Sequence, residues 1–182
     1  MPQKIVENWH RLSSILVLAS VLGMLFGLGA CNPGPTEATL PFETIEQKEL
    51  AGTGKPYKLR EPGLIIISRI DEVNNLNGLI TDEAKAKLQA VDYSGYFALL
   101  VLQGWKPTMG YKVSIDHIAR IENTVNIYAE FLEPEPDKEI SPAETSPYHL
   151  VKVQKTGNWD QDITFNLFAG ERLMISLSRA IP

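Results

Sequence analysis

Two neighbouring stretches near the middle of the chain differ in hydrophobic pattern and predict two strands of different burial. Phe97 to Leu102 is an unbroken apolar run between Gly95 and Gly104. Its length and its glycine boundaries favour a strand that is buried on both faces. Apolar and polar residues then alternate from Tyr111 to Glu122, which indicates a strand with only one buried face.

Shorter alternating or β-branched stretches predict further strands along the rest of the chain. A tight turn at Asn123–Thr124 would join the alternating strand to the next one. A second turn, at Ala169–Gly170, predicts a hairpin at the C-terminal end. The remaining predicted strands cover Phe42–Leu50, Leu64–Ser68, Val125–Phe131, Tyr148–Val153 and the two arms of the final hairpin around 163–167 and 173–177.

Helical signals are confined to one part of the chain. Thr81 has the character of an N-cap, and acidic residues follow it in the first turn, where the helix dipole favours them. Ala84, Leu88 and Val91 then recur at helical spacing. Asp71 to Asn77 reads as a helical turn or a loop. Because strands outnumber helices, the sequence predicts a mainly β domain over residues 42–182: a two-layer antiparallel β-sandwich with one short helical insertion.

The first thirty residues have the pattern of an export signal. A basic start is followed by an apolar stretch, Ile15 to Leu28, that is short for a membrane span. The stretch ends in Leu28-Gly-Ala-Cys31, which resembles a bacterial lipobox and contains the only cysteine of the chain. We therefore expect a lipoprotein signal peptide at 1–30, acylation of Cys31 and a Pro/Gly-rich tether at 31–41. The alternative is an ordinary signal or an N-terminal membrane anchor.

The predicted export signal and the acidic net charge indicate where the protein is located and which partners it is not expected to bind. Removal of residues 1–30 takes away two basic residues and one acid, which changes the formal net charge from −5 to −6. An acidic body without a basic cluster argues against binding to nucleic acid. We expect the protein on the outer face of a bacterial membrane, in the cell envelope, held by acyl chains on Cys31.

The supply of catalytic groups is small. The alternation places His117 on the buried face and Asp116 on the opposite face, so the two should not pair. His149, at the start of a strand, is interpreted as a satisfied core histidine. The chain contains no nucleophile elbow, zinc-binding helix or phosphate-binding glycine loop. The acidic, proline-containing stretch 133–142 lacks the features of a calcium loop and is read as exposed. We expect no enzyme activity, no catalytic residues, no metal and no cofactor.

The loop between the two central strands is the best candidate for a contact with a protein partner. Pro107 fixes φ and Gly110 permits a positive φ, so the loop should be stiff. Large apolar side chains at a surface turn are typical interface anchors. In the alternative, Trp105 folds back onto the core and the loop is architectural. The candidate contact residues are Trp105, Lys106, Pro107, Thr108, Met109, Gly110 and Tyr111.

Three segments in this order carry a resemblance to a known family. They are Val91-Asp-Tyr-Ser before the apolar strand, Gly104-x-x-Pro-Thr-x-Gly-Tyr111 after it, and Ser146-Pro-Tyr-His-Leu-Val-Lys-Val153. Together they resemble the PrcB C-terminal domain over about residues 64–155, with Met109 where that family usually has a second glycine. The last segment adds Pro147 and Tyr148 to the candidate contact residues. The resemblance implies a non-catalytic accessory or stabilising subunit of a surface protease.

Two other functions are consistent with the sequence. Pro107-Thr-x-Gly-Tyr111 is also similar to a loop of chagasin-like protease inhibitors, in which a glycine-rich loop and an Arg-Pro-aromatic loop follow. Here the glycine pair, Gly52 and Gly54, comes earlier, and Ser146 stands where the arginine would be. An enzyme with an unrecognised site is the other alternative. The leading hypothesis is a lipid-anchored module that binds a protein partner.

Overall fold

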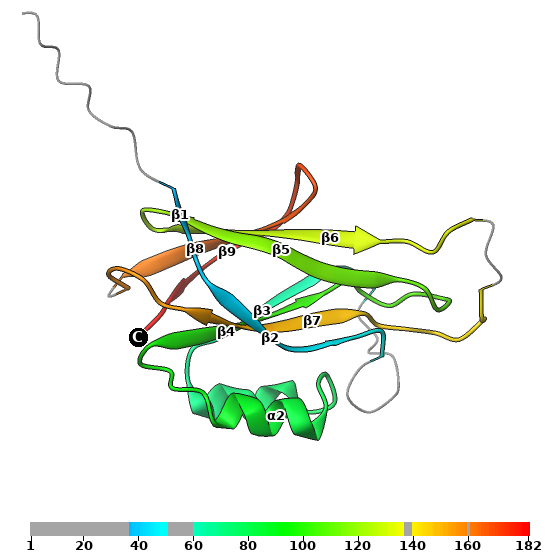
Figure 1. Ribbon diagram of the computed structural model, residues 1–182, viewed down its shortest axis with the longest axis horizontal. Helices are drawn as coiled ribbons and strands as arrows, with labels where there is room; N and C mark the ends of the chain where they lie inside the picture. The colour runs from blue at the N-terminus through cyan, green and yellow to red at the C-terminus, as the bar shows by residue number, and fades with distance from the viewer. Residues whose placement is uncertain (1–36, 51–59, 137–139, 160) are drawn as a thin grey trace, which may run out of the picture. The chain divides into compact units, whose positions relative to one another are not determined.

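The computed structural model describes residues 37–50, 60–136, 140–159 and 161–182, which belong to one compact unit (Figure 1). The predicted signal peptide, Cys31 and the glycines Gly52 and Gly54 lie outside these residues. Among the described residues, no helix has both the length and the apolar character needed to cross a membrane.

Two sheets pack against each other, and the chain is mainly β, with 51% strand and 11% helix. This confirms the predicted fold class. In the five-stranded sheet the order is β1 (Ala38–Thr39), β5 (Lys112–Ile121), β6 (Thr124–Leu132), β8 (Asp162–Ala169) and β9 (Arg172–Ala180). In the four-stranded sheet the order is β2 (Phe42–Lys48), β7 (Tyr148–Gln154), β4 (Tyr96–Leu102) and β3 (Gly63–Ile67).

Paired strands are antiparallel except at one position, where the prediction of a wholly antiparallel sandwich is wrong. Strands β6 and β8 pair in parallel, from Thr124 opposite Thr164 to Ala129 opposite Ala169. The reason is the path of the chain between them. After β6 the chain crosses to the other sheet, runs back as β7 and returns, so β8 starts at the same end of the sheet as β6 (Figure 1).

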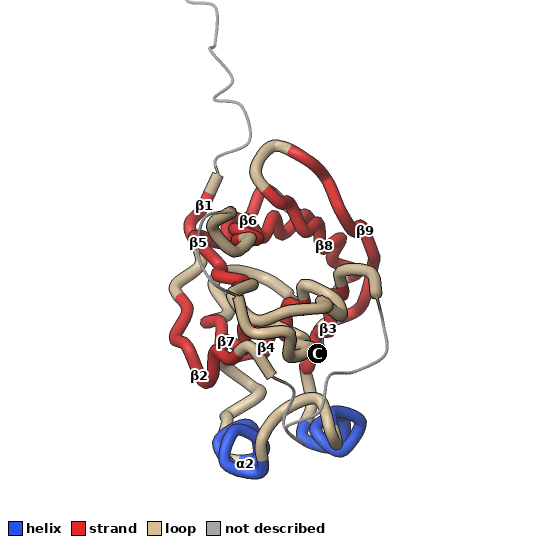
Figure 2. The backbone as a smooth tube through the Cα atoms, turned by 90° about the vertical axis from the view of Figure 1, so that its right-hand side faces the viewer, coloured by secondary structure: helices blue, strands red, loops and turns tan. Residues whose placement is uncertain are grey.

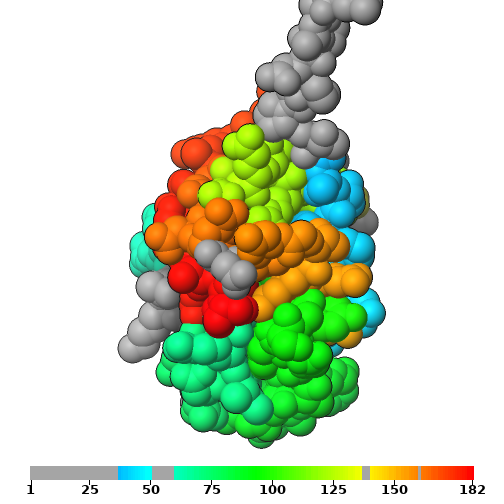
Figure 3. Space-filling model, turned by 90° about the vertical axis from the view of Figure 1, so that its left-hand side faces the viewer, coloured from blue at the N-terminus to red at the C-terminus, as the bar shows by residue number. Residues whose placement is uncertain are grey.

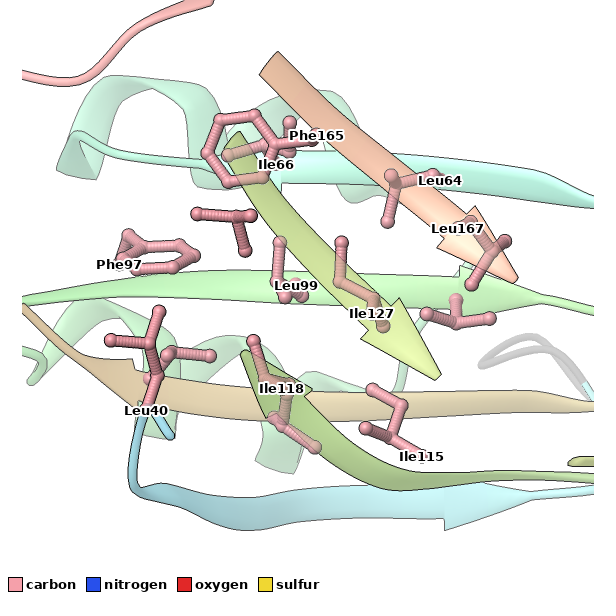
Figure 4. Packing of buried hydrophobic residues seen from close by; sticks show 14 of the residues in the cluster. Leu40, Leu64, Ile66, Phe97, Leu99, Ile115, Ile118, Ile127, Phe165 and Leu167 are labelled. Atoms are coloured by element: carbon pink, nitrogen blue, oxygen red, sulfur yellow. The ribbon is translucent and has the colours of Figure 1, made fainter. Parts of the chain in front are cut away.

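One apolar cluster fills the space between the sheets (Figure 4). Within it the Phe97 ring lies 5.1 Å from the ring of Trp159 and 5.9 Å from that of Phe165, measured between centroids. Each fully buried large apolar side chain contributes about 1.5–3 kcal/mol to folding. The cluster includes Leu40, Leu64, Ile66, Phe97, Leu99, Ile115, Ile118, Ile127, Phe165 and Leu167.

Two short helices cover the other face of the four-stranded sheet, where one helical insertion was predicted. They are the 3₁₀-helix η1 (Ile70–Leu76) and the α-helix α2 (Asp82–Gln89). Figures 2 and 3 show them as a layer on the side of the molecule away from β5 and β6. Alternate β4 residues face the helices and the sandwich interior, and all of Phe97–Leu102 is therefore buried. This explains the unbroken apolar run in the sequence.

The predicted helix start is confirmed in detail. The Thr81 side-chain oxygen accepts a hydrogen bond from the Ala84 backbone N–H at 3.1 Å, the standard N-cap interaction. Ala84 and Leu88 are buried against the sheet, while Val91 lies beyond the end of the helix and is partly exposed.

Two boundaries differ from the prediction. The folded body begins before Phe42, because β1 pairs with β5 and Leu40 is buried in the main core. The turn between β5 and β6 consists of Glu122 and Asn123, one residue earlier than predicted, and Glu122 adopts a positive φ of 51°. The C-terminal hairpin of β8 and β9 is confirmed.

Candidate binding surface

The loop between β4 and β5 is held at both ends by glycines that no other residue replaces easily. Gly104 has φ +91°, and a Cβ there would lie 2.2 Å from the Arg60 carbonyl oxygen. Gly110 has φ +94°, and its Cβ would lie 2.8 Å from the Cβ of Pro134. Both positions combine a left-handed backbone with a close neighbour, so the loop has one well-defined path.

Hydrogen bonds tie this loop to the segment that precedes β7. The backbones of Lys106 and Thr145 exchange two bonds of 2.9 Å. The Thr145 hydroxyl donates to the Thr108 carbonyl at 2.8 Å, and the Met109 N–H donates to the Ser141 carbonyl at 3.2 Å. Two segments far apart in the sequence are thus fixed beside each other.

Some large apolar side chains of this region are partly buried and others are exposed to solvent. Trp105 is half-buried, and the guanidinium of Arg60 lies 5.3 Å from its ring centroid. Met109 is 38% exposed and Leu132, at the end of β6, is 47% exposed. Trp105 is therefore neither a fully exposed contact residue nor a side chain buried in the core, the two alternatives that the sequence left open. Met109 is the most exposed large apolar group of the loop.

Met109 and Leu132 line an open groove at this end of the sandwich. Isolated exposed apolar residues are ordinary on protein surfaces, but adjacent ones in a groove are typical of binding sites. The groove is lined by Glu49, Met109, Gly110, Lys112, Leu132, Glu133, Pro134, Glu135, Ile140 and Ser141. We call these residues the loop groove.

Pro147 and Tyr148, which were also predicted to contact a partner, are buried. The Tyr148 hydroxyl donates a hydrogen bond to the Glu46 carboxylate, which also accepts from the Thr81 hydroxyl at 2.6 Å. Burial, together with the bond to Glu46, raises the pKa of Tyr148 above its ordinary range. Burial would raise the pKa of Glu46, but the bonds from Thr81 and Tyr148 outweigh it and lower that pKa. This network joins helix α2 to the four-stranded sheet and leaves Tyr148 unavailable to a partner.

The buried location also bears on the inhibitor alternative. A loop that blocks a protease must present its side chains to solvent, whereas the Pro147–Tyr148 pair lies inside the fold. Thr108 and Tyr111 of the central loop are only partly exposed. The described residues therefore do not present the exposed Pro-aromatic loop that the inhibitor alternative requires.

His149 is a core histidine, as predicted. It is 3% exposed, its Nδ1 accepts the Ile115 backbone N–H at 2.8 Å, and its Nε2 lies 2.8 Å from the Thr44 hydroxyl. Because Nδ1 accepts, the proton of the neutral ring is on Nε2, which donates to Thr44. Burial lowers the pKa of His149 to about 4.

The prediction for His117 is wrong. A β-bulge between Ile115 and His117 interrupts the alternation of β5, so both Asp116 and His117 point to solvent. The two side chains, predicted not to pair, are 2.7 Å apart between Nδ1 and Oδ2. The His117 ring stacks on Tyr128 at 4.2 Å on the outer face of the sheet.

Gln103, which the sequence analysis did not select, connects the central loop to the loop groove. It is 2% exposed, and its side-chain amide donates to the Leu132 carbonyl at 3.2 Å. Its Oε1 is the one buried side-chain polar atom in the described part of the chain without a hydrogen-bond partner. A polar residue directly before Gly104, at the end of an apolar strand, was the signal that could have identified it.

No group of three or more potential metal ligands occurs among the described residues, which include most of the acidic loop. The described residues include three features: a loop with a glycine at each end, a groove with exposed apolar side chains, and a buried hydrogen-bond network. The described residues thus form a mainly β sandwich with one candidate contact surface.

Comparison with known families gives a match. Residues 98–154 match the family described as PrcB C-terminal. The match begins within β4 and ends with β7, so it includes the central loop and most of the loop groove. It is shorter than the predicted range of about 64–155 and does not include Val91–Ser94. It confirms the resemblance to the PrcB C-terminal family, which is a family of accessory subunits and not a known catalytic domain. Searches of curated proteins and of solved structures found no match.

Proposed function

We propose that this chain is a lipid-anchored, extracytoplasmic protein-binding module that acts as an accessory or stabilising subunit of a surface protease. In this function it contributes binding and no chemistry of its own. The loop groove contacts the partner, and the sandwich holds the groove in shape.

The observation that carries the proposal is the pairing of Met109 and Leu132 in one groove. They come from different elements, and each leaves more than a third of its side chain exposed. The glycines at 104 and 110 and the bonds to Thr145 fix the loop before a partner arrives. A preorganised surface loses little conformational entropy on binding. The PrcB C-terminal match lies over the same residues.

The proposed location rests on the N-terminal sequence. The Leu28-Gly-Ala-Cys31 motif supports export, cleavage before Cys31 and acylation of that cysteine. Acyl chains would hold the body on the outer face of a bacterial membrane, where a surface protease is within reach.

The test is capture of the partner by crosslinking and affinity purification from membranes of the source organism. Leu132→Ser should reduce capture about tenfold or more, the equivalent of about 1.4 kcal/mol. Ile70→Ser is the matched control, because Ile70 is 57% exposed on η1, outside the groove. Equal capture by both variants would remove the loop groove from the proposal.

The same experiment tests the class of partner. The proposal expects a protease, or a subunit bound to one, among the proteins that the unmodified chain captures and Leu132→Ser does not. Capture that depends on Leu132 but contains no protease would keep the binding module and exclude the accessory function.

A further inference from the structure

The loop groove carries more acidic than basic side chains. Of the residues that line it, Glu49, Glu133 and Glu135 are acids, and Lys112 is the one base among them. Glu133 and Glu135 are exposed, and Glu49 is partly exposed. Charged side chains at the rim of an interface determine which partners are attracted and which are repelled. The groove therefore favours a ligand with positive charge.

The same groove also requires an apolar group from its ligand. The exposed side chains of Met109 and Leu132 line it, and the partly exposed Pro134 and Ile140 extend the apolar lining. The groove has a volume of about 630 Å³. This volume is in the range of clefts that enclose ligands of small-molecule size, so the groove holds a few side chains of a partner.

The backbone of β5 next to the groove is already hydrogen-bonded on its open side. Strand β5 begins at Lys112, and the Gln47 side-chain amide donates to the Val113 carbonyl at 2.7 Å. The next outward-facing amide, that of Ile115, donates to His149 Nδ1 at 2.8 Å. A partner at the groove is therefore recognised by its side chains and not by addition of a strand to this part of β5.

The groove and the N-terminal strand lie at opposite ends of β5 (Figure 1). Strand β1 pairs with Ala119 and Arg120, whereas Lys112 borders the groove. The eight residue steps from 112 to 120 span about 26 Å of strand. With the anchor that we propose at Cys31, the chain enters the body at β1, far from the groove. The acids of the groove also repel the anionic phosphates of lipids, so both features favour a protein segment over the membrane surface.

We propose that the loop groove binds a basic-apolar segment of the partner protein, in which leucine, isoleucine, methionine or phenylalanine lies next to lysine or arginine. The apolar side chains of this segment contact Met109 and Leu132, and its cationic groups pair with Glu49 and Glu133. This inference rests on the proposed function, because it defines the chemistry of the partner at the same surface. An acidic segment of the same shape is rejected by like-charge repulsion.

Selection of displayed random heptapeptides against the full-length protein in phospholipid nanodiscs tests this chemistry without the natural partner. The enriched peptides should combine lysine or arginine with a large apolar residue, and acidic peptides should be depleted. The double variant Glu49→Gln with Glu133→Gln should bind an enriched peptide about fivefold more weakly at low salt. The matched control is Glu122→Gln with Glu171→Gln, which removes the same charge at exposed positions outside the groove and should bind like the unmodified chain.

Three results would overturn the inference: enrichment of acidic or uncharged peptides, no enrichment at all, or equal affinity of the groove variant and the control variant. None of them affects Leu132-dependent capture from native membranes, so failure of the basic-apolar chemistry is distinguishable from failure of the proposed function. Conversely, enrichment of basic-apolar peptides without Leu132-dependent capture would keep the chemistry of the groove and remove the accessory function.

Discussion

At the scale of single residues, His149 connects the two sheets. It is on β7 of the four-stranded sheet and accepts the N–H of Ile115 on β5 of the five-stranded sheet. In this stretch β5 has β6 on one side and no strand on the other, because β1 pairs only with Ala119 and Arg120. The imidazole therefore satisfies an amide that would otherwise be buried without a partner.

This arrangement makes folding stability depend on the pH. The pKa of His149 is about 4 in the folded chain and about 6.5 when unfolded. The unfolded state therefore binds the proton more readily between these values. The stabilisation is complete above pH 6.5 and is lost as the pH falls towards 4, by on the order of 3 kcal/mol in total. Protonation of Nδ1 would also break the bond from Ile115.

Urea unfolding between pH 7 and pH 4.5 measures this dependence. His149→Asn keeps an acceptor near Ile115 but cannot be protonated, so its stability should change much less in this range. Glu46, whose pKa is lowered, changes the stability only at a lower pH than His149 does. Its stabilisation is present above the ordinary pKa of a glutamate and is lost as the pH falls below that value. Parallel stability curves for the two proteins would exclude His149 as the cause.

At the scale of elements, the central loop depends on glycine at both ends. The sequence correctly indicated a stiff loop, because Pro107 and Gly110 are recognisable signals. Its packing against Pro134 and Thr145 could not be derived from spacing, since these residues are distant in the chain.

Gly110→Ala should destabilise the fold by about 1–3 kcal/mol, since the methyl group meets both a positive φ and the ring of Pro134. Gly170→Ala is the matched control. Gly170 also has a positive φ, +57°, but nothing lies within 4 Å of its added Cβ. Gly170→Ala should lower the free energy of unfolding by about 1 kcal/mol, from the strained backbone alone. Thermal or denaturant unfolding measures the loss of stability in each variant, and the difference between the two losses is the cost of the clash with Pro134. An equal loss of unfolding free energy in both variants would show that the Pro134 contact is unimportant.

Strand β5 shows why alternation predicts a strand more reliably than it predicts which side chains are buried. The pattern identified the strand correctly, but the bulge after Ile115 shifts the faces of the residues beyond it by one position. Ile118 is fully buried, and Arg120, predicted on the polar face, is 7% exposed. The Arg120 guanidinium donates to the carbonyls of Thr156 and Asn158 and lies 4.2 Å from the centroid of the Trp159 ring.

At the scale of the whole molecule, Arg120 holds the crossover between the sheets in place. The segment from β7 to β8 is the connection that returns the chain to the five-stranded sheet, and its carbonyls surround this buried cation. The crossover in turn sets the parallel pairing of β6 with β8. One side chain from β5 therefore supports the topology that distinguishes this sandwich from a simple antiparallel one.

The proposed anchor also belongs to this scale, because it decides where the entire body is held. Cys31→Ala should abolish metabolic labelling with a fatty acid and leave an unprocessed chain with residues 1–30 attached, since the thiol is the acylation site. Mass spectrometry of the N-terminus reports both effects. Labelling that persists in Cys31→Ala would contradict the lipobox interpretation.

The sequence by itself determined every strand except β1, together with the helix cap, the fold class and the family resemblance. These depend on local backbone preferences and on hydrophobic periodicity, which neighbouring residues record directly. It also identified the central loop and the core character of His149.

Only the tertiary structure decided the parallel pair, the shift of faces in β5, the burial of Tyr148 and the placement of Met109 and Leu132 along one groove. Each of these depends on contacts between residues that are distant in the chain. Such contacts are set by how the two sheets and the helices pack together, and no local pattern encodes that packing.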